Sequence, residues 1–79
     1  MYKLFIDNQQ ELEDFYPDSF PKEWTICKNF SDLITTFQEK GLPFIISVCN
    51  DEFGKQCMEW IFDYSWDARK FSQIVKVHR

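Results

Sequence analysis

Five polar residues that could bind an ion or take part in catalysis come directly after predicted strands of this chain. They are Asp7, Asn8, Asn50, Asp51 and His78. Because the carboxyl ends of parallel strands meet at one edge of a sheet, where α/β proteins bind their ligands, we expect these residues to form a strand-end pocket. Two carboxylates, amide oxygens and an imidazole suit a divalent cation. The same residue types also start turns and cap helices, so we predict no metal site.

A thiol nucleophile and its base would have to be built from Cys49 and His78. That chemistry also needs an oxyanion-binding turn and a third group that orients the histidine, and the sequence indicates neither. We therefore interpret Cys49 as a small residue of the core or its rim. Cys27 and Cys57 complete an odd set without a C-x-x-C spacing. All three lie in apolar stretches, which is typical of buried, reduced thiols in an intracellular protein.

The last predicted helix, over residues 55–67, carries more apolar surface than packing on one sheet requires. Its inner stripe is expected to pack on the sheet and consists of Cys57, Trp60, Ile61 and Tyr64. A second apolar row recurs every four residues, about 100° or more around the helix from the first. This row consists of Met58, Phe62 and Trp66. Either the linker over residues 67–72 folds back over the row, or the row contacts a partner or a second copy of the chain.

An acidic run that contains aromatic side chains lies in the first quarter of the chain. Residues 7–18 include five acids and no lysine or arginine. Such a run can dock on a basic surface or steer association electrostatically, although a solvated helix face is the commoner outcome. We predict a secondary binding patch that consists of Asp14, Phe15, Tyr16 and Asp18.

Four β-favouring runs and three helical stretches must position these residues. Strands are expected at 2–6, 23–27, 43–48 and 73–77, and helices at 9–16, 32–40 and 55–67. Ser31 is the expected N-cap of the second helix, and Gly41 is expected to end it. The run at 43–48 lacks charge on both alternating faces, as in the middle of a parallel sheet. The alternation of helices and strands predicts an α/β fold with a four-stranded, mostly parallel sheet flanked by two or three helices.

Length, charge and the pattern of apolar residues indicate the number of domains, the kind of partner and the location of the protein. Seventy-nine residues make a single domain, residues 1–79, and nine phenylalanines, three tyrosines and three tryptophans supply the volume of its core. The formal net charge of −4 disfavours attraction to nucleic acid phosphates and to anionic membranes, so we expect a partner with a basic surface. The N-terminus lacks a signal-peptide pattern and no apolar run is long enough to span a membrane, so we expect a cytoplasmic protein.

Three short segments resemble one known family. They are Leu4-Phe5-Ile6-Asp7-Asn8, the segment 46–51 followed by Gly54, and Val75-Lys76-Val77-His78. This pattern is similar to that of the small receiver-like proteins of phage and prophage genomes, the cREC family. Members of that family open with a strand that runs into two aspartates, continue with a central strand that ends in Asp-x-Asp-x-Gly, and have a later strand that ends in Val-His-Ser. The resemblance implies a truncated receiver or flavodoxin-like fold.

The chain departs from this family at its acidic positions. Asn8 replaces the second opening aspartate, and Cys49 stands where the resemblance places a phosphoryl-accepting aspartate. An active receiver needs two acids to hold Mg²⁺ and a third carboxylate to accept the phosphoryl group. The resemblance therefore implies a pseudo-receiver in which phosphotransfer is disfavoured.

We predict a non-catalytic protein-interaction module that needs no cofactor. By its resemblance it is expected to be a small phage-encoded regulator or inhibitor that binds a host protein in the host cytoplasm, for example in anti-defence. A homodimer through the exposed edge of the last strand is a further expectation. Two alternatives stay open. One is divalent-metal-dependent phosphoryl or phosphodiester chemistry at the strand ends, and the other is an acidic inhibitor that mimics DNA.

Overall fold

The computed structural model describes residues 2–18, 23–65 and 74–78 of the chain. Its elements in chain order are β1 (Lys3–Ile6), α1 (Leu12–Phe15), β2 (Trp24–Cys27), α2 (Phe30–Lys40), β3 (Ile45–Val48), α3 (Glu52–Ser65) and β4 (Ile74–Val77). The four strands form one parallel sheet in the order β2-β1-β3-β4. The predicted α/β fold with a four-stranded parallel sheet is confirmed.

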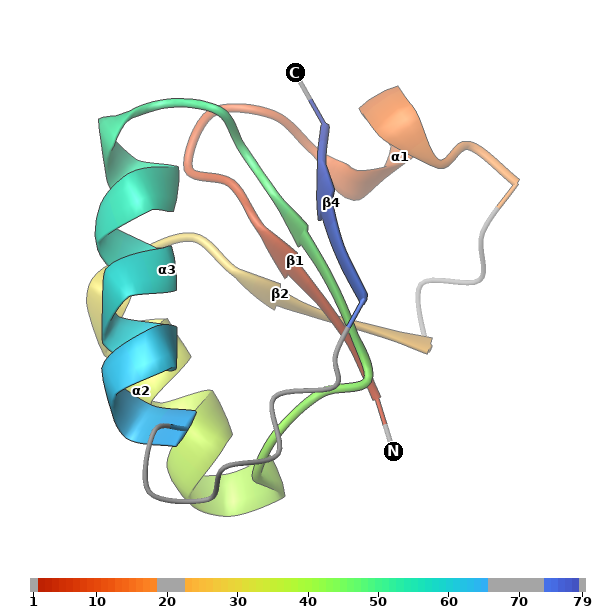
Figure 1. The fold of residues 1–79 in the computed structure, drawn as a ribbon. Helices are drawn as coiled ribbons and strands as arrows, with labels where there is room; N and C mark the ends of the chain where they lie inside the picture. Colours follow the sequence, from red (N-terminus) through yellow and green to blue (C-terminus); the bar gives the residue numbers. More distant parts are fainter. Residues whose placement is uncertain (1, 19–22, 66–73, 79) are drawn as a thin grey trace.

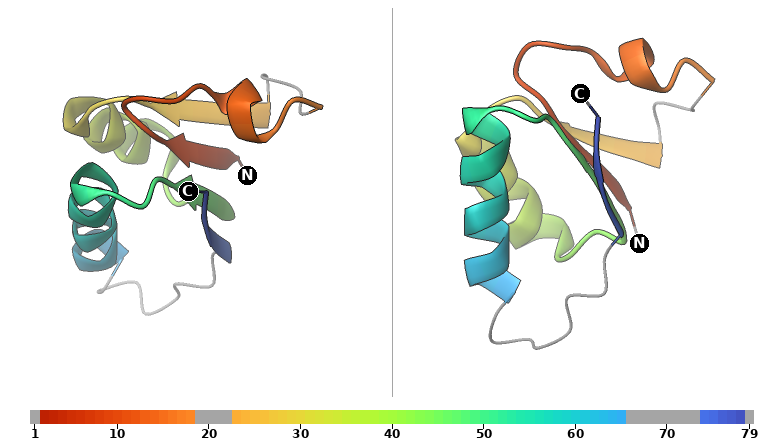
Figure 2. Two further views of the ribbon diagram at one scale, coloured as in Figure 1. Left: turned by 90° about the horizontal axis from the view of Figure 1, so that it is seen from above. Right: turned by 45° about the horizontal axis from the view of Figure 1, so that its top comes forward.

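The direction of each crossover places the helices on two faces of this sheet. The chain moves from β1 to β2 through α1 in one direction, and from β2 to β3 and β4 through α2 and α3 in the other. Because parallel crossovers are right-handed, opposite directions place their helices on opposite faces. Figures 1 and 2 show α2 and α3 together on one face and α1 on the other. This strand order is that of a flavodoxin-like sheet without its last strand.

The main hydrophobic core lies between the sheet and the layer formed by α2 and α3. Side chains alternate along each strand, so every second residue of the sheet points into this layer. The buried residues of the core are Leu4, Ile6, Cys27, Leu33, Phe37, Ile46, Val48, Cys57 and Ile61. In β3 the side chains of both faces are buried from Ile46 to Val48, as predicted for a strand covered on two sides.

Two helices begin earlier than predicted because each is capped by a different residue. The Asn29 side chain accepts a hydrogen bond of 2.8 Å from the backbone N–H of Asp32, so α2 begins at Phe30 and Ser31 lies within its first turn. The Asp51 carboxylate accepts a hydrogen bond of 3.0 Å from the backbone N–H of Gly54, so α3 begins at Glu52 instead of residue 55. Asparagine, aspartate and serine cap helices about equally well, which is why the residue type alone did not locate these ends.

The first helix is shorter than predicted because a turn occupies its expected start. One carboxylate oxygen of Asp7, Oδ1, accepts hydrogen bonds from the backbone N–H groups of Gln9 and Gln10, at 2.8 and 3.0 Å. This turn holds the chain away from helical geometry, and α1 is confined to Leu12–Phe15. Gly41 ends α2 as predicted, with a φ of 75° that favours glycine. Among the helices of the described residues, none has the length and apolar content to cross a membrane.

Candidate functional site

A chain of hydrogen bonds joins β1, β3 and β4 on the face of the sheet covered by α1. The Nε2 atom of His78 lies 2.9 Å from Oδ2 of Asp7, and its Nδ1 atom lies 2.7 Å from the hydroxyl oxygen of Ser47. The same hydroxyl of Ser47 lies 2.8 Å from the hydroxyl of Tyr16, just beyond α1. Asp7, Ser47 and His78 are all buried. We call these four side chains the His78 network.

Aromatic rings enclose the imidazole of His78. The ring of Phe5 stacks on it, with centroids 4.5 Å apart and planes 11° apart, and the ring of Phe15 contacts it at 4.5 Å. Tyr16 stacks in turn on Trp24, with centroids 5.0 Å apart. These rings keep water away from the network, where hydrogen bonds are strong and a lost partner is costly.

Serine, histidine and aspartate are also the residue types of hydrolytic triads, so access to Ser47 decides what the network can do. A catalytic hydroxyl must reach a substrate carbonyl. The side chain of Ser47 is fully buried, and its oxygen already contacts both Tyr16 and His78. This geometry favours a structural role, in which the network ties the last strand to the first.

The sequence placed Asp7 and His78 in one pocket, and the structure brings them into contact. It did not indicate Ser47 or the hydroxyl of Tyr16 as their partners. A signal was present, because Ser47 is the polar residue within an apolar central strand. A hydroxyl in such a strand must find hydrogen-bond partners when the strand is covered on both faces.

The other residues of the predicted strand-end pocket have separate surroundings. The Oδ1 atom of Asp51 accepts hydrogen bonds from the Cys49 thiol and from the backbone N–H of Gly54, each at 3.0 Å. Asn8 and Asn50 are exposed. Across residues 2–18, 23–65 and 74–78, no group of three or more His, Cys, Asp or Glu side chains is arranged to hold a metal ion.

The thiols are placed for packing. Cys27, Cys49 and Cys57 are buried, and the two ring nitrogens of His78 contact Ser47 and Asp7, so this histidine is not placed as a base for Cys49. Burial raises the pKa of Cys57 to about 12 and also raises the pKa of Cys27. Thiols whose pKa is raised by burial stay protonated near neutral pH and are poor nucleophiles.

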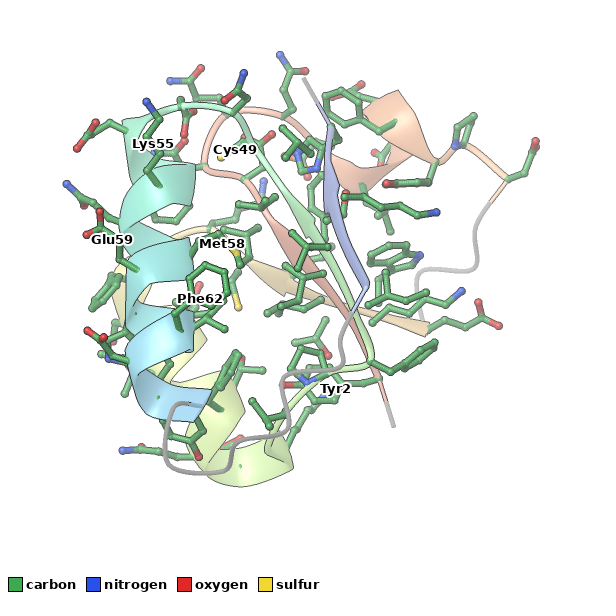
Figure 3. All side chains as sticks on the ribbon, in the orientation of Figure 1. Tyr2, Cys49, Lys55, Met58, Glu59 and Phe62 are labelled. Atoms are coloured by element: carbon green, nitrogen blue, oxygen red, sulfur yellow. The ribbon has the colours of Figure 1, made fainter. Side chains whose placement is uncertain are left out.

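An apolar groove lies between α3 and β4. It has a volume of about 280 Å³ and is lined by Val48, Cys49, Asn50, Gly54, Lys55, Met58, Glu59, Phe62 and Val77. Figure 3 shows Met58 and Phe62 on the side of α3 that faces the strands. Phe62 and Val77 remain 50% and 60% exposed as whole residues, so the groove opens to solvent. We call this feature the α3–β4 groove.

The groove contains two members of the second apolar row that the sequence predicts on this helix. Met58 packs partly against the core, and Phe62 is half-exposed at the groove wall. Trp66 lies outside the described residues, as does the linker over residues 67–72 that was the alternative cover for this row. The contribution of β4 was not predicted, although the alternation of Val75 and Val77 around a lysine was a signal for an apolar strand face.

The four residues of the predicted acidic patch differ in exposure, because only some of them face the sheet. Asp14 and Asp18 are exposed, and the Asp14 carboxylate accepts a hydrogen bond of 2.9 Å from the backbone N–H of Glu11. Phe15 and Tyr16 are half-buried, where they cover the His78 network. The aromatic members therefore have a packing role, and a binding role for the patch stays a prediction.

A scan against protein-family models found no match, and searches of curated proteins and of solved structures also found none.

Proposed function

We propose that this protein is a non-catalytic protein-interaction module whose α3–β4 groove binds a partner protein. The observation that supports this proposal is the half-exposure of Phe62 and Val77 on facing elements of an apolar groove. Adjacent apolar side chains that stay in contact with water are typical of surfaces that bind other proteins. The resemblance to receiver-like phage domains adds the proposal that the partner is a host protein.

Buried side chains other than Phe62 attach α3 to the sheet. Cys57 and Ile61, from the inner stripe of the same helix, are fully buried and attach it to the sheet. Phe62 follows Ile61 directly and is half-exposed. Aromatic and methionine side chains are favoured at protein interfaces, and half of the surface of Phe62 is exposed.

The openness of the groove favours a protein partner over an enclosed small molecule. Pockets that enclose a drug-sized ligand usually measure about 300–1,000 Å³ and cover most of its surface. The α3–β4 groove measures about 280 Å³ and is open to solvent at Phe62 and Val77. It suits a few side chains that project from the surface of another protein.

This proposal is tested by two substitutions in the groove and a control on the opposite face. Phe62→Gln keeps a good helix former, and Val77→Thr keeps a β-branched side chain, while each removes apolar contact area. Glu13→Gln on α1 changes an exposed residue on the other face of the sheet. Each tagged variant is expressed in cells that naturally contain the protein, and the partner that co-purifies with the wild type is quantified together with the thermal midpoint.

We expect both groove variants to lower recovery of that partner at least about tenfold, because central apolar contacts dominate most interfaces. Their thermal midpoints should stay within a few degrees of the wild type, and Glu13→Gln should change neither quantity. Equal recovery of the partner by all four proteins would show that the groove is not the binding surface.

A further inference from the structure

β4 lies at an edge of the sheet and offers hydrogen-bonding groups along its outer side. Within the described residues it pairs with β3 alone. The backbone N–H of His78 donates to the carbonyl oxygen of Val48 at 3.1 Å, so the backbone groups of His78 face β3. Because these groups alternate in direction along a parallel strand, those of Lys76 also face β3, and those of Val75 and Val77 face outward.

The two faces of β4 differ in chemistry. Val75 and Val77 lie on the face covered by α2 and α3, where Val77 lines the α3–β4 groove. Lys76 lies on the other face, in register with Ser47, and is exposed. A strand added beside β4 would therefore meet an apolar surface on one face and a cation on the other.

We propose that the occupant of this edge is an extended segment of the partner protein that adds to β4 as a fifth strand. Apolar side chains of the segment enter the α3–β4 groove beside Val77, and an acidic side chain on its other face pairs with Lys76. Main-chain hydrogen bonds to Val75 and Val77 provide affinity, and the alternate side chains provide specificity, as in other cases of strand addition. The inference rests on the proposed function and specifies the class of ligand.

The charge of Lys76 distinguishes a foreign strand from a second copy of the chain. When two copies of β4 pair antiparallel about a two-fold axis centred on Lys76, the two lysines lie opposite each other on one face. Like charges directly opposite destabilise a strand pair, and lysines on edge strands commonly prevent such self-association. An acidic residue opposite Lys76 removes the repulsion. The edge therefore fits a segment in which an acidic residue lies between two apolar residues better than it fits β4 of a second copy of the chain.

The test uses synthetic heptapeptides and the purified full chain. One peptide alternates valine with glutamate, a second alternates valine with lysine, and a third is the glutamate peptide with alternate backbone nitrogens methylated. Binding is titrated by chemical shifts of the backbone amides, and the hydrogen exchange of Val75 and Val77 amides is measured in the complex. The variants are Lys76→Glu and, as a charge-reversal control, Lys28→Glu. Lys28 is exposed beyond the end of the other edge strand, β2, and its ammonium lies 2.6 Å from the Glu11 carboxylate in a surface ion pair, a kind of contact that contributes little to stability.

We expect the glutamate peptide to bind at least about fivefold more tightly than the lysine peptide, and Lys76→Glu to reverse this order, while Lys28→Glu leaves it unchanged. The amides of Val75 and Val77 should exchange several-fold more slowly in the complex, and the methylated peptide should not bind. These results together support strand addition.

Three outcomes would overturn the inference. Equal affinity for the glutamate and lysine peptides would show that Lys76 does not select an acidic segment. Shifts at Met58 and Phe62 without slower exchange at Val75 and Val77 would leave the groove as a binding surface and exclude strand addition. Concentration-dependent dimerisation that protects the same two amides would assign the edge to a second copy of the chain.

Discussion

His78 and Asp7 are separated by 71 positions in the sequence, and their side chains meet at 2.9 Å beneath α1. This contact fixes the end of β4, the last strand, to the end of β1, the first. Because β4 forms one wall of the α3–β4 groove, the His78 network on one face of the sheet positions the proposed binding surface on the other. In the proposed function, the buried polar groups would therefore hold the binding surface in place without contacting the partner.

Removing His78 should destabilise the fold strongly. His78→Ala leaves the buried Asp7 carboxylate without its imidazole partner and opens a cavity between Phe5 and Phe15. We expect the free energy of unfolding, measured with urea, to fall by about 3 kcal/mol. Asn50→Ala at an exposed strand end is the control and should change it by less than about 0.5 kcal/mol. A loss below about 1 kcal/mol for His78→Ala would show that the network contributes little.

Gly54 cannot accept a side chain without a shift of the backbone. A Cβ atom at this position would lie 1.9 Å from the carbonyl oxygen of Cys49. Gly54→Ala should therefore displace the start of α3 and lower the free energy of unfolding by about 2–4 kcal/mol, despite the higher helix propensity of alanine. Gln56→Ala, at an exposed position of the same helix, should be nearly neutral. Stabilisation by Gly54→Ala would contradict this packing.

Stability should fall at alkaline pH. Burial raises the pKa of Cys57 from 9.0 to about 12, and it raises the pKa values of Cys27 and Tyr2 in the same direction. Above pH 9 the unfolded chain therefore loses the Cys57 proton while the folded chain keeps it. The free energy of unfolding should decrease between pH 9 and 12, by at most about 1.4 kcal/mol per pH unit for each group.

Unfolding curves at several pH values measure this slope. Cys57→Ala removes one of the titrating groups, so its free energy of unfolding should fall less steeply with pH than that of the wild type. A steeper fall in the variant, or stability that rises with pH in this range, would contradict the burial of the thiol.

Two neighbouring residues of α3 should respond differently to truncation. Ile61 is fully buried in the core, and Phe62 is 50% exposed in the groove. Ile61→Ala should lower the free energy of unfolding by about 2–5 kcal/mol, because it creates a cavity, whereas Phe62→Gln should lower it by about 1 kcal/mol or less. Chemical denaturation of both variants measures the difference. Equal losses would place Phe62 in the core and leave it unavailable for binding.

The sheet could be predicted from the sequence because its signals are local. The uncharged run of β3 indicates a strand covered on both faces, and alternation of helices and strands indicates parallel pairing. Periodicity alone does not give the strand order, which depends on contacts between distant segments, and only the resemblance implied a flavodoxin-like sheet. The start of α2 was displaced because Asn29 and Ser31 have similar capping propensity, and α3 begins before residue 55 because Asp51 caps it.

The candidate site was predicted only in part for the same reason. The periodicity of α3 identifies Met58 and Phe62 as an additional apolar row. It does not show that β4 forms the opposite wall, since that depends on strand order. Similarly, Asp7 and His78 follow strands that meet at one edge, but the link through Ser47 and Tyr16 requires the position of α1 over the sheet.

The central claim, that the α3–β4 groove binds a protein partner, is tested most directly by site-specific photo-crosslinking in cells that naturally contain the protein. A benzophenone amino acid replaces Val77 in the groove in one variant and Glu13 on the opposite face in another. We predict a discrete adduct with a partner protein from position 77, absent from position 13 and strongly reduced by Phe62→Gln. Adducts of equal yield from both positions, or none from position 77, would contradict the account.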